Sequence, residues 1–354
     1  MIKNSLLLSR VLAAGFILFA SANTAAAMNP EENLKAIERH DQAVHVMDEW
    51  MRDPYIYLAK DGYYYMTCTT TNYIKGGVPG IGVWRSEDLA NWENLSPLWT
   101  VEDSSWMQPL IPVAESFDRQ FHIWAPEIHF FDGRWVVVFT SSGRRSNIIF
   151  SQGEKLEGPF SEPFGYDFDK RHDPAFFTDD DGTRWLLYAR NKIIKMSDDL
   201  ESFAGEPIDI GPSNRKIGHE GLYMIKVSEK YALFGTGWST DKMRHGSYNL
   251  YYCTGDSVTG PFGPRKFAAR FCGHGTPFQD KKGRWWTTAF LNGNDGVPRV
   301  DGSNATMPSD PVNICKLGMT LVPLEIGIGD DGDVVIKAKD SDYAEPGPEE
   351  VQQF

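Results

Sequence analysis

A short polar motif followed by a hairpin pattern occurs five times along this chain, and no other feature constrains the fold as strongly. Each motif precedes an apolar or aromatic run, a turn and a second aromatic-rich run. Four of the five turns carry an Asp-Gly or Lys-Gly pair, and such pairs between apolar runs predict β-hairpins. The five copies start at RDP (52–54), WAPE (124–127), HDP (172–174), GHEG (218–221) and GHG (273–275).

A third apolar segment follows most copies, so each repeat supplies three or four strands. The middle copies are spaced by roughly 45 to 50 residues, which is typical of propeller blades. The first repeat is longer, and we assign residues 96–121 to an insertion. We therefore predict an all-β fold, a five-bladed β-propeller over residues 51–340. A β-sandwich does not explain a polar motif at the start of every repeat.

The two ends of the chain do not follow the repeat. Lys3 and Arg10 flank an apolar run that ends in Ala25-Ala26-Ala27, which predicts a signal peptide over residues 1–27 and a periplasmic or secreted protein. Residues 28–50 are predicted to form a helical extension that caps the propeller. Residues 341–354 read as a polar C-terminal tail.

Charge and cysteine content exclude several partners. The net charge of −13 opposes binding to nucleic acids and anionic membranes, so we expect neither as a partner. It also disfavours a strongly anionic polysaccharide, unless a local basic pocket overrides it. The four cysteines lack a C-x-x-C pair, which favours buried free thiols over a zinc site, while the three complete disulfide pairings remain open. The sequence does not determine the oligomeric state.

The polar motifs of a propeller converge because the innermost strand of each blade starts at the same mouth of the central channel. Asp53, Asp173 and Glu220 would then surround one pocket. Two carboxylates across a pocket suit glycoside hydrolysis, in which an ionised group activates water or attacks the sugar and a protonated group donates to the leaving oxygen. A third acid nearby would raise the pKa of the donor. The high aromatic content, 13%, also fits a sugar-binding protein.

The same five motifs, in this order and spacing, resemble glycoside hydrolase family 43 and its five-bladed relatives, families 62, 32, 68 and 117. The resemblance covers roughly residues 50 to 335. It implies an inverting mechanism with Asp53 as the general base, Glu220 as the general acid and Asp173 as the group that adjusts the pKa of the acid. It also implies that His274 helps to hold a calcium or other ion in the channel, although the chemistry itself requires no cofactor.

Other residues of the motifs are candidate substrate contacts: Arg52, Trp124, Glu127, His172 and His219. The chain departs from the family pattern at Glu127, where Asp is common, and at Leu222, where Pro is common. The pair His219-Glu220 is also similar to family 117, in which a histidine beside the acid is thought to donate the proton.

We therefore expect an exported hydrolase that cleaves terminal glycosidic bonds of plant or algal polysaccharide fragments. The resemblance favours an α-L-arabinofuranosidase or a β-xylosidase. One alternative is a 3,6-anhydro-α-L-galactosidase in which His219 is the acid. The other is a non-catalytic propeller that only binds glycans.

Overall fold

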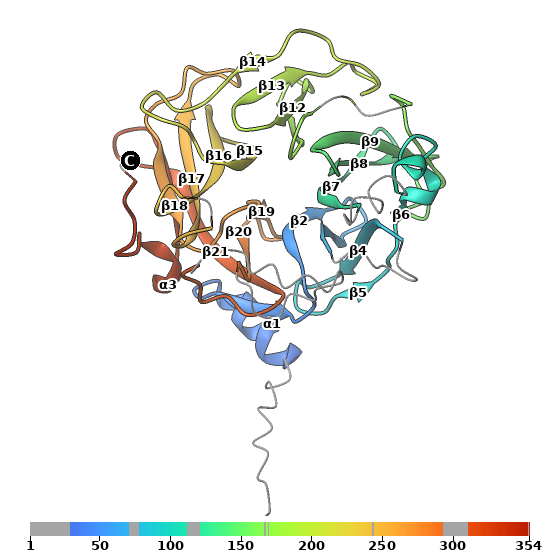
Figure 1. Cartoon of the computed structure of the whole chain (residues 1–354). Coiled ribbons are helices and arrows are strands. Elements are labelled where there is room, and N and C mark those ends of the chain that lie inside the picture. The colour runs from blue at the N-terminus through green and yellow to red at the C-terminus, as the bar shows by residue number, and fades with distance from the viewer. Residues whose placement is uncertain are drawn as a thin grey trace, which may run out of the picture.

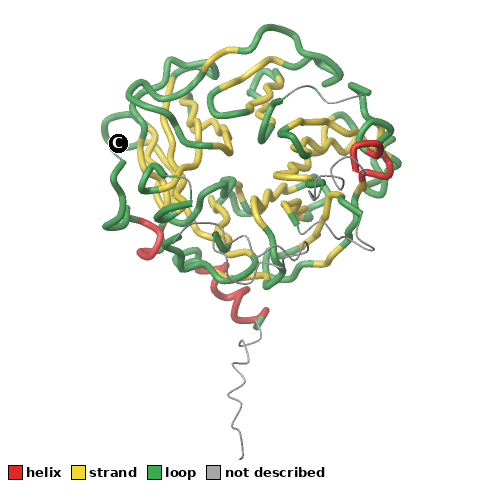
Figure 2. Tube along the Cα trace, in the orientation of Figure 1, coloured by secondary structure: helices red, strands yellow, loops and turns green. Residues whose placement is uncertain are grey.

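Five antiparallel sheets stand around a central axis in the computed structural model, which confirms the predicted five-bladed propeller (Figure 1). Strands and loops make up nearly all of the ring, and helices occur only at its periphery (Figure 2). The structure describes residues 29–70, 78–111, 121–165, 168, 170–242, 244–292, 311–352 and 354. The predicted signal peptide, residues 1–27, lies outside the described residues.

The first three blades follow the repeats, each running outward from its innermost strand. Blade 1 contains β2 (Arg52–Leu58), β3 (Tyr64–Thr69), β4 (Gly80–Ser86) and β5 (Glu93–Asn94), with β6 (Trp99–Thr100) also paired to β4. Blade 2 contains β7 (Ile123–Phe131), β8 (Arg134–Ser141), β9 (Arg145–Ser151) and β10 (Phe160–Ser161). Blade 3 contains β11 (Ala175–Thr178), β12 (Arg184–Tyr188), β13 (Lys192–Lys195) and β14 (Ile208–Asp209). Two short 3-10 helices, Val101–Asp103 and Gln108–Leu110, follow β6.

The last two blades lie beside the chain ends. Blade 4 contains β15 (Glu220–Val227), β16 (Lys230–Trp238), β17 (Tyr248–Gly255) and β18 (Lys266–Ala269). Blade 5 contains β19 (Phe278–Gln279), β20 (Trp285–Phe290), β21 (Met319–Ile328) and β1 (Val44–Met47), with β22 (Val334–Ala338) also paired to β21.

The predicted hairpin turns form as their sequences require. In blade 2, Phe131 pairs with Arg134, and the two residues between them, Asp132 and Gly133, have φ values of 51° and 77°. Two left-handed residues in a two-residue loop match the type I′ turn, whose twist fits antiparallel strands. Gly62, Gly182 and Gly283 are left-handed in the corresponding turns of their blades.

The N-terminal segment differs from its prediction. The helix α1 spans only Pro30–Arg39, and Val44–Met47 is a strand that pairs antiparallel with β21. The sequence analysis had extended the helix to residue 50. The apolar side chains of Val44, Val46 and Met47 are buried against blade 5, so the segment completes a sheet and closes the ring instead of capping it.

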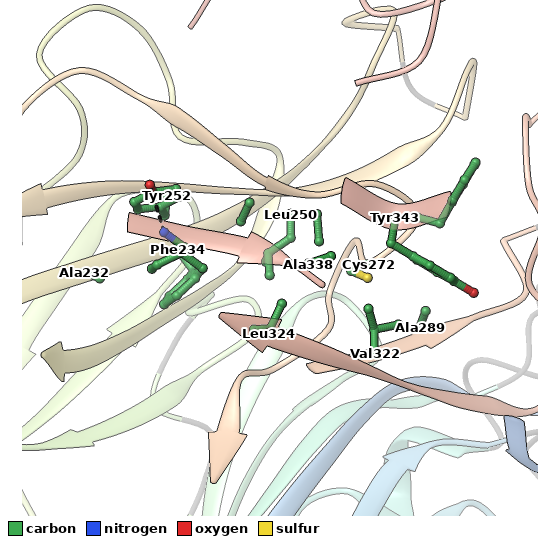
Figure 3. Packing of buried hydrophobic residues seen from close by; sticks show 14 of the residues in the cluster. Ala232, Phe234, Leu250, Tyr252, Cys272, Ala289, Val322, Leu324, Ala338 and Tyr343 are labelled. Atoms are coloured by element: carbon green, nitrogen blue, oxygen red, sulfur yellow. Dashed lines mark hydrogen bonds between the residues drawn. The ribbon is translucent and has the colours of Figure 1, made fainter. Parts of the chain in front are cut away.

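The C-terminal tail is packed against blade 4. A short helix, α3 (Ser341–Ala344), begins it and buries Tyr343 in the apolar layer between blades 4 and 5 (Figure 3). Glu349 receives two hydrogen bonds from Arg270, at 2.6 and 2.7 Å, and Glu350 receives one from Tyr251 at 2.8 Å. The predicted polar tail therefore packs along the outside of the ring, and we refer to this packed segment as the C-terminal clasp.

The apolar core consists of layers between neighbouring blades rather than one central mass. Between blades 4 and 5, Phe234 and Leu250 face Val322, Leu324 and other side chains of the last blade (Figure 3). The four cysteines, Cys68, Cys253, Cys272 and Cys315, are buried free thiols. No helix among the described residues is long and apolar enough to cross a membrane.

Candidate active site

One position near the start of the innermost strand is left-handed in every blade. Asp53, Ala125, Asp173, Gly221 and His274 have φ values of 52°, 44°, 48°, 65° and 59°. The strand register shifts at this position in blades 1, 2 and 4. Such a conformation costs a non-glycine residue about 1–2 kcal/mol. Its recurrence at the mouth of the channel therefore indicates a functional site.

The aligned positions revise one detail of the sequence analysis. Asp53 and Asp173 occupy equivalent positions, as expected, but the equivalent residue of blade 4 is Gly221. Glu220 lies one residue earlier and aligns with Arg52 and His172. His274 shares the position of the two aspartates, so a histidine in blade 5 lies where blades 1 and 3 carry acids.

A chain of close contacts nevertheless joins the three predicted acids. The Nδ1 atom of His274 lies 3.2 Å from Oδ1 of Asp53 and 4.0 Å from Oδ2 of Asp173. The Nε2 atom of His172 lies 3.2 Å from Oδ2 of Asp173 and 3.4 Å from Oε2 of Glu220. Asp173 is therefore central, and each histidine bridges it to one of the outer acids.

Asp53 is held in its ionised form. Burial alone would raise the pKa of Asp53, but the positive charge of His274 and its hydrogen bond outweigh burial and hold the pKa below its usual range. Thr69 donates a 2.8 Å hydrogen bond to Oδ2, and the backbone N–H of Ala125 donates to the same hydroxyl at 2.8 Å. This link from blade 1 to blade 2 fixes the carboxylate in place.

Asp173 and Glu220 differ in the direction of their pKa shifts. Burial raises the pKa of Asp173, whereas Glu220 has a lowered pKa because hydrogen bonds from His172 and Tyr248, together with positive charge from His274, outweigh burial. The pKa of His172 is raised by the charge of Asp173 and by Glu220, against burial. Asp173 and His172, which adjoin Glu220, therefore both have raised pKa values and hold their protons to higher pH than usual.

Glu127 lies deeper in the channel. It lines the central pocket with Ala125, Asp173, Gly221, Tyr223 and His274. Burial raises the pKa of Glu127 well above its usual value, and its Oε2 accepts a 3.3 Å hydrogen bond from the backbone N–H of Phe176 and lies 3.4 Å from Nε2 of His129. Burial also lowers the pKa of His129 to about 3, so this imidazole is neutral. Glu127 makes no ion pair with an arginine among the described residues; a hydroxyl contact stays a prediction.

The other predicted substrate contacts surround the mouth. Trp124 stacks on His122, with ring centroids 5.3 Å apart, and Arg52 lies over the ring of Phe290. The backbone N–H of His219 donates to Thr236 at 2.5 Å, and burial lowers the pKa of its imidazole. Both His219 and Glu220 have lowered pKa values, so the choice of Glu220 as the acid stays a prediction.

His274 already has a charge partner. Burial would lower its pKa, but Asp53 and Asp173 raise the pKa of His274 to about 10. An imidazolium has no lone pair for a metal ion, and calcium prefers six to eight oxygen ligands. His274 thus supplies the positive charge beside the two aspartates, a part that a cation could also play. Calcium binding at His274 stays a prediction, and the chemistry below does not depend on it.

Two groups that complete the site escaped the sequence analysis. Tyr248 starts the third strand of blade 4 and donates a 2.7 Å hydrogen bond to Oε1 of Glu220. Thr140 accepts a 2.9 Å bond from the backbone N–H of Asp173. Tyr248 and Thr140 lie in aromatic or β-branched segments that are typical of core strands. The sequence therefore does not distinguish these two residues from residues that only pack in the core.

The fold and the site together define a class of enzyme. An ionised, anchored Asp53 can act as a base, and Glu220 can receive a proton from its neighbours and pass it on. Opposed carboxylates of this kind in one pocket are the machinery of glycoside hydrolases. The model of glycosyl hydrolases family 43 matches residues 46–308, most of the chain. The chain belongs to glycosyl hydrolases family 43.

Known relatives agree with this assignment. A β-D-galactofuranosidase, xynD, from Aspergillus niger is 24% identical over 295 residues, which cover 80% of this chain and 78% of that protein. A xylan 1,3-β-xylosidase from a Vibrio species is 25% identical over 284 residues, covering 71% and 49%. A xylosidase/arabinosidase 43B from Humicola insolens is 32% identical over 146 residues, covering 38% and 24%. The chain thus spans about half or less of the latter two proteins.

Solved structures share the fold. The family 43 protein BlXynB from Bacillus licheniformis superposes with a TM-score of 0.60 at 22% identity, over 85% of this chain and 57% of that one. An endo-1,4-β-xylanase from Bacteroides thetaiotaomicron gives a TM-score of 0.58 at 21% identity, over 84% and 97%. At these identities the likeness concerns the architecture alone.

Proposed function

We propose that this family 43 enzyme releases terminal sugars from plant or algal polysaccharide fragments by an inverting mechanism, as an α-L-arabinofuranosidase or a β-xylosidase. The observation that carries the proposal is the chain of contacts from Asp53 through His274, Asp173 and His172 to Glu220. At one end of this chain of contacts, Asp53 is ionised. At the other end, Glu220 adjoins His172, whose pKa is raised.

In this mechanism the Asp53 carboxylate accepts a proton from a water molecule whose oxygen attacks the anomeric carbon. Glu220 gives a proton to the glycosidic oxygen, and the bond to the leaving sugar breaks. Glu220 must take up a proton before it can donate one, and Nε2 of His172, 3.4 Å from Oε2 of Glu220, is the neighbouring group that supplies it. The Glu220 side chain is 29% exposed against 10% for Asp53, which suits a donor nearer the mouth.

The choice of sugar is supported by the relatives. Their names include β-D-galactofuranosidase, xylosidase/arabinosidase and xylan 1,3-β-xylosidase. Pentosides and furanosides are therefore the first substrates to test. The anhydro-galactosidase alternative needs His219 as the acid, whereas Glu220 is the residue that contacts join to Asp173 and Asp53.

Export is part of the proposal. It rests on the N-terminal sequence and on two relatives whose names describe them as extracellular, an exo-α-(1→5)-L-arabinofuranosidase from Streptomyces avermitilis and an endo-α-(1→5)-L-arabinanase from Bacillus subtilis. Mass spectrometry of the protein from the periplasm or medium should find a mature chain that starts at Met28. A mature chain that starts at Met1 would overturn this part.

The deciding experiment screens the purified protein on aryl glycosides and natural oligosaccharides, with Asp53→Asn, Glu220→Gln and His219→Ala variants alongside. We expect release of a pentose, loss of at least about 100-fold in kcat for Asp53→Asn and Glu220→Gln, and a smaller effect of His219→Ala. NMR should show that the first product has the inverted anomeric configuration. Activity confined to agar fragments and abolished by His219→Ala would favour the anhydro-galactosidase, and a retained configuration would contradict the mechanism.

A further inference from the structure

Arginines gather around the mouth of the pocket although the chain as a whole carries a charge of −13. In each blade the loop between the second and third strands lies at the same end as the active site. The described parts of the loops at this end in blades 2, 3 and 4 are residues 142–144, 189–191, and 239–242 with 244–247. Each contributes one arginine, Arg144, Arg190 or Arg244, and we refer to these three residues as the arginine rim.

Backbone pairing places the rim beside the catalytic groups. The N–H of Ala189, next to Arg190, donates to the carbonyl of His172 at 2.6 Å. In blade 4, Glu220 pairs with Thr236, and Trp238 pairs with Tyr248 at the start of the next strand. The loop that carries Arg244 therefore begins directly beyond the strand end that faces Glu220. In blade 2 the N–H of Ser142 donates to the carbonyl of His122, two residues before Trp124.

The rim charges are not balanced by acids of these loops. Asp241 is the one acidic residue in the described parts of the three loops, and it lies 3.8 Å from Arg215. Among the described residues, neither Arg190 nor Arg244 forms an ion pair within 4.0 Å. Burial, followed by repulsion from Arg52, lowers the pKa of Arg244, while the charges of Glu220 and Asp53 act to raise it. Arg244 thus lies within electrostatic range of the catalytic acids without forming an ion pair with them.

The catalytic acids do not require these arginines. Asp53, Asp173 and Glu220 each lie within 3.4 Å of a histidine nitrogen, from His274 or His172. The acids therefore have their counter-charges inside the pocket. Positive groups farther out are free to attract a ligand, and guanidinium groups suit planar or tetrahedral anions because they donate two parallel hydrogen bonds.

We propose that the substrate carries a negative charge, a uronate carboxylate or a sulfate ester, close to the cleaved bond, and that the arginine rim binds it. The inference rests on the proposed glycosidase function and narrows its substrate class to acidic glycans. The net charge of −13 adds selectivity, because it disfavours non-specific binding of a polyanion to the chain as a whole.

Paired ligands that differ only in charge test the proposal by calorimetry with the inactive Glu220→Gln protein. The carboxylate arm compares xylotetraose with and without a glucuronic acid branch. The sulfate arm compares a 4-sulfated carrageenan disaccharide with its desulfated form. We expect the charged member of at least one arm to bind 10-fold or more tightly at low salt. That preference should shrink in about 0.5 M salt, because salt screens exposed charges.

Single variants in the same background locate the effect. Arg190→Gln and Arg244→Gln should each reduce the preference several-fold. Lys60→Gln removes an exposed positive charge from the turn at the opposite end of blade 1 and should leave it unchanged. Equal binding within both arms, no binding in either arm, or a preference that survives both rim substitutions would overturn the proposal.

The aryl glycoside assay on the wild-type protein separates the two ideas. If the protein hydrolyses pentosides but binds charged and uncharged ligands equally, the proposed function is supported and the acidic substrate is rejected. If the protein prefers charged ligands but hydrolyses no pentoside, binding by the arginine rim is supported and the proposed sugar is rejected. Equal melting temperatures of the variants show that a lost preference does not reflect unfolding.

Discussion

The hydroxyl of Tyr248 donates a 2.7 Å hydrogen bond to Oε1 of Glu220, from the third strand of blade 4 to the first residue of its innermost strand. Thr236 lies between these strands, and its hydroxyl is 2.9 Å from the same Tyr248 oxygen. The bond stabilises the ionised form of Glu220 and aims its other oxygen at His172. Tyr248 is thus a positioning residue for the proposed acid.

Tyr248→Phe should therefore raise the pKa of Glu220 and lower kcat/KM. A hydrogen bond to a charged group contributes about 1.5–3 kcal/mol, so we expect its loss to lower kcat/KM by roughly 10- to 100-fold. The pH–rate profile is the diagnostic measurement, because the limb that reports the protonated acid should move to higher pH. Tyr252→Phe is the control for loss of a buried hydroxyl in the same strand; it removes a 3.3 Å bond to the carbonyl of Val334 and a 3.2 Å bond from the N–H of Ile336. A lowered rate with an unmoved limb would contradict the assignment.

Thr69 connects the proposed base to the neighbouring blade, so Thr69→Val should affect both activity and stability. The variant leaves the buried Ala125 N–H without its acceptor and Oδ2 of Asp53 without the Thr69 donor, at a cost of about 1–3 kcal/mol. Urea unfolding and kcat/KM measure the two effects. Thr69→Ser keeps the hydroxyl and should restore most of each; failure of Ser to do so would point to packing of the methyl group instead.

The ion pair of His274 predicts a specific pH dependence of stability. The pKa of His274 is raised from 6.5 to about 10, so its stabilising contribution is complete below about pH 6.5 and is lost as the pH rises towards 10. The difference in unfolding free energy between wild type and His274→Gln should therefore shrink over this window. Urea titrations at several pH values measure it. A constant difference would mean that His274 is neutral in the folded protein.

Gly221 occupies the left-handed position of blade 4, and Gly221→Ala should be harmful there. A methyl group would lie 3.0 Å from Cδ2 of His274, on a backbone with φ of 65°. We expect a loss of about 1–2 kcal/mol from the backbone alone, and lower activity as His274 shifts. Gly182→Ala, at a left-handed turn with open space around it, carries the backbone cost without the contact. Equal activity of the two variants would show that the contact is harmless.

The C-terminal clasp can be tested at Gln352. This side chain accepts a 2.6 Å hydrogen bond from the buried guanidinium of Arg265 and donates to the carbonyl of Trp238. Gln352→Ala should destabilise the protein by about 1.5–3 kcal/mol, because a buried charged donor loses its side-chain acceptor and keeps only the carbonyls of Lys216 and Ile217. Gln279→Ala, which removes an exposed amide, is the control for urea unfolding. Equal stability of the two variants would show that the tail is dispensable.

The repeat pattern predicted the ring because each turn carries its own local signal, such as the Asp132-Gly133 pair. It also placed Asp53, Asp173 and Glu220 at one mouth. The prediction failed at Val44–Met47, since four residues are too few to distinguish a strand from a helix by their period. It could not find Tyr248 or the charge state of Glu220. Those depend on contacts across strands, which the local sequence does not specify.

The pairing of β1 with β21 has a consequence for synthesis. Val44–Met47 leaves the ribosome early, whereas its partner, Met319–Ile328, is among the last strands to be made. The earlier blades can stack as they emerge, but the seam between the two ends cannot form until almost the whole chain is available. A nascent or C-terminally truncated chain would expose the unpaired edge of β1 and Val44, Val46 and Met47 beside it. Premature termination is therefore expected to give an open, aggregation-prone arc rather than a smaller working enzyme.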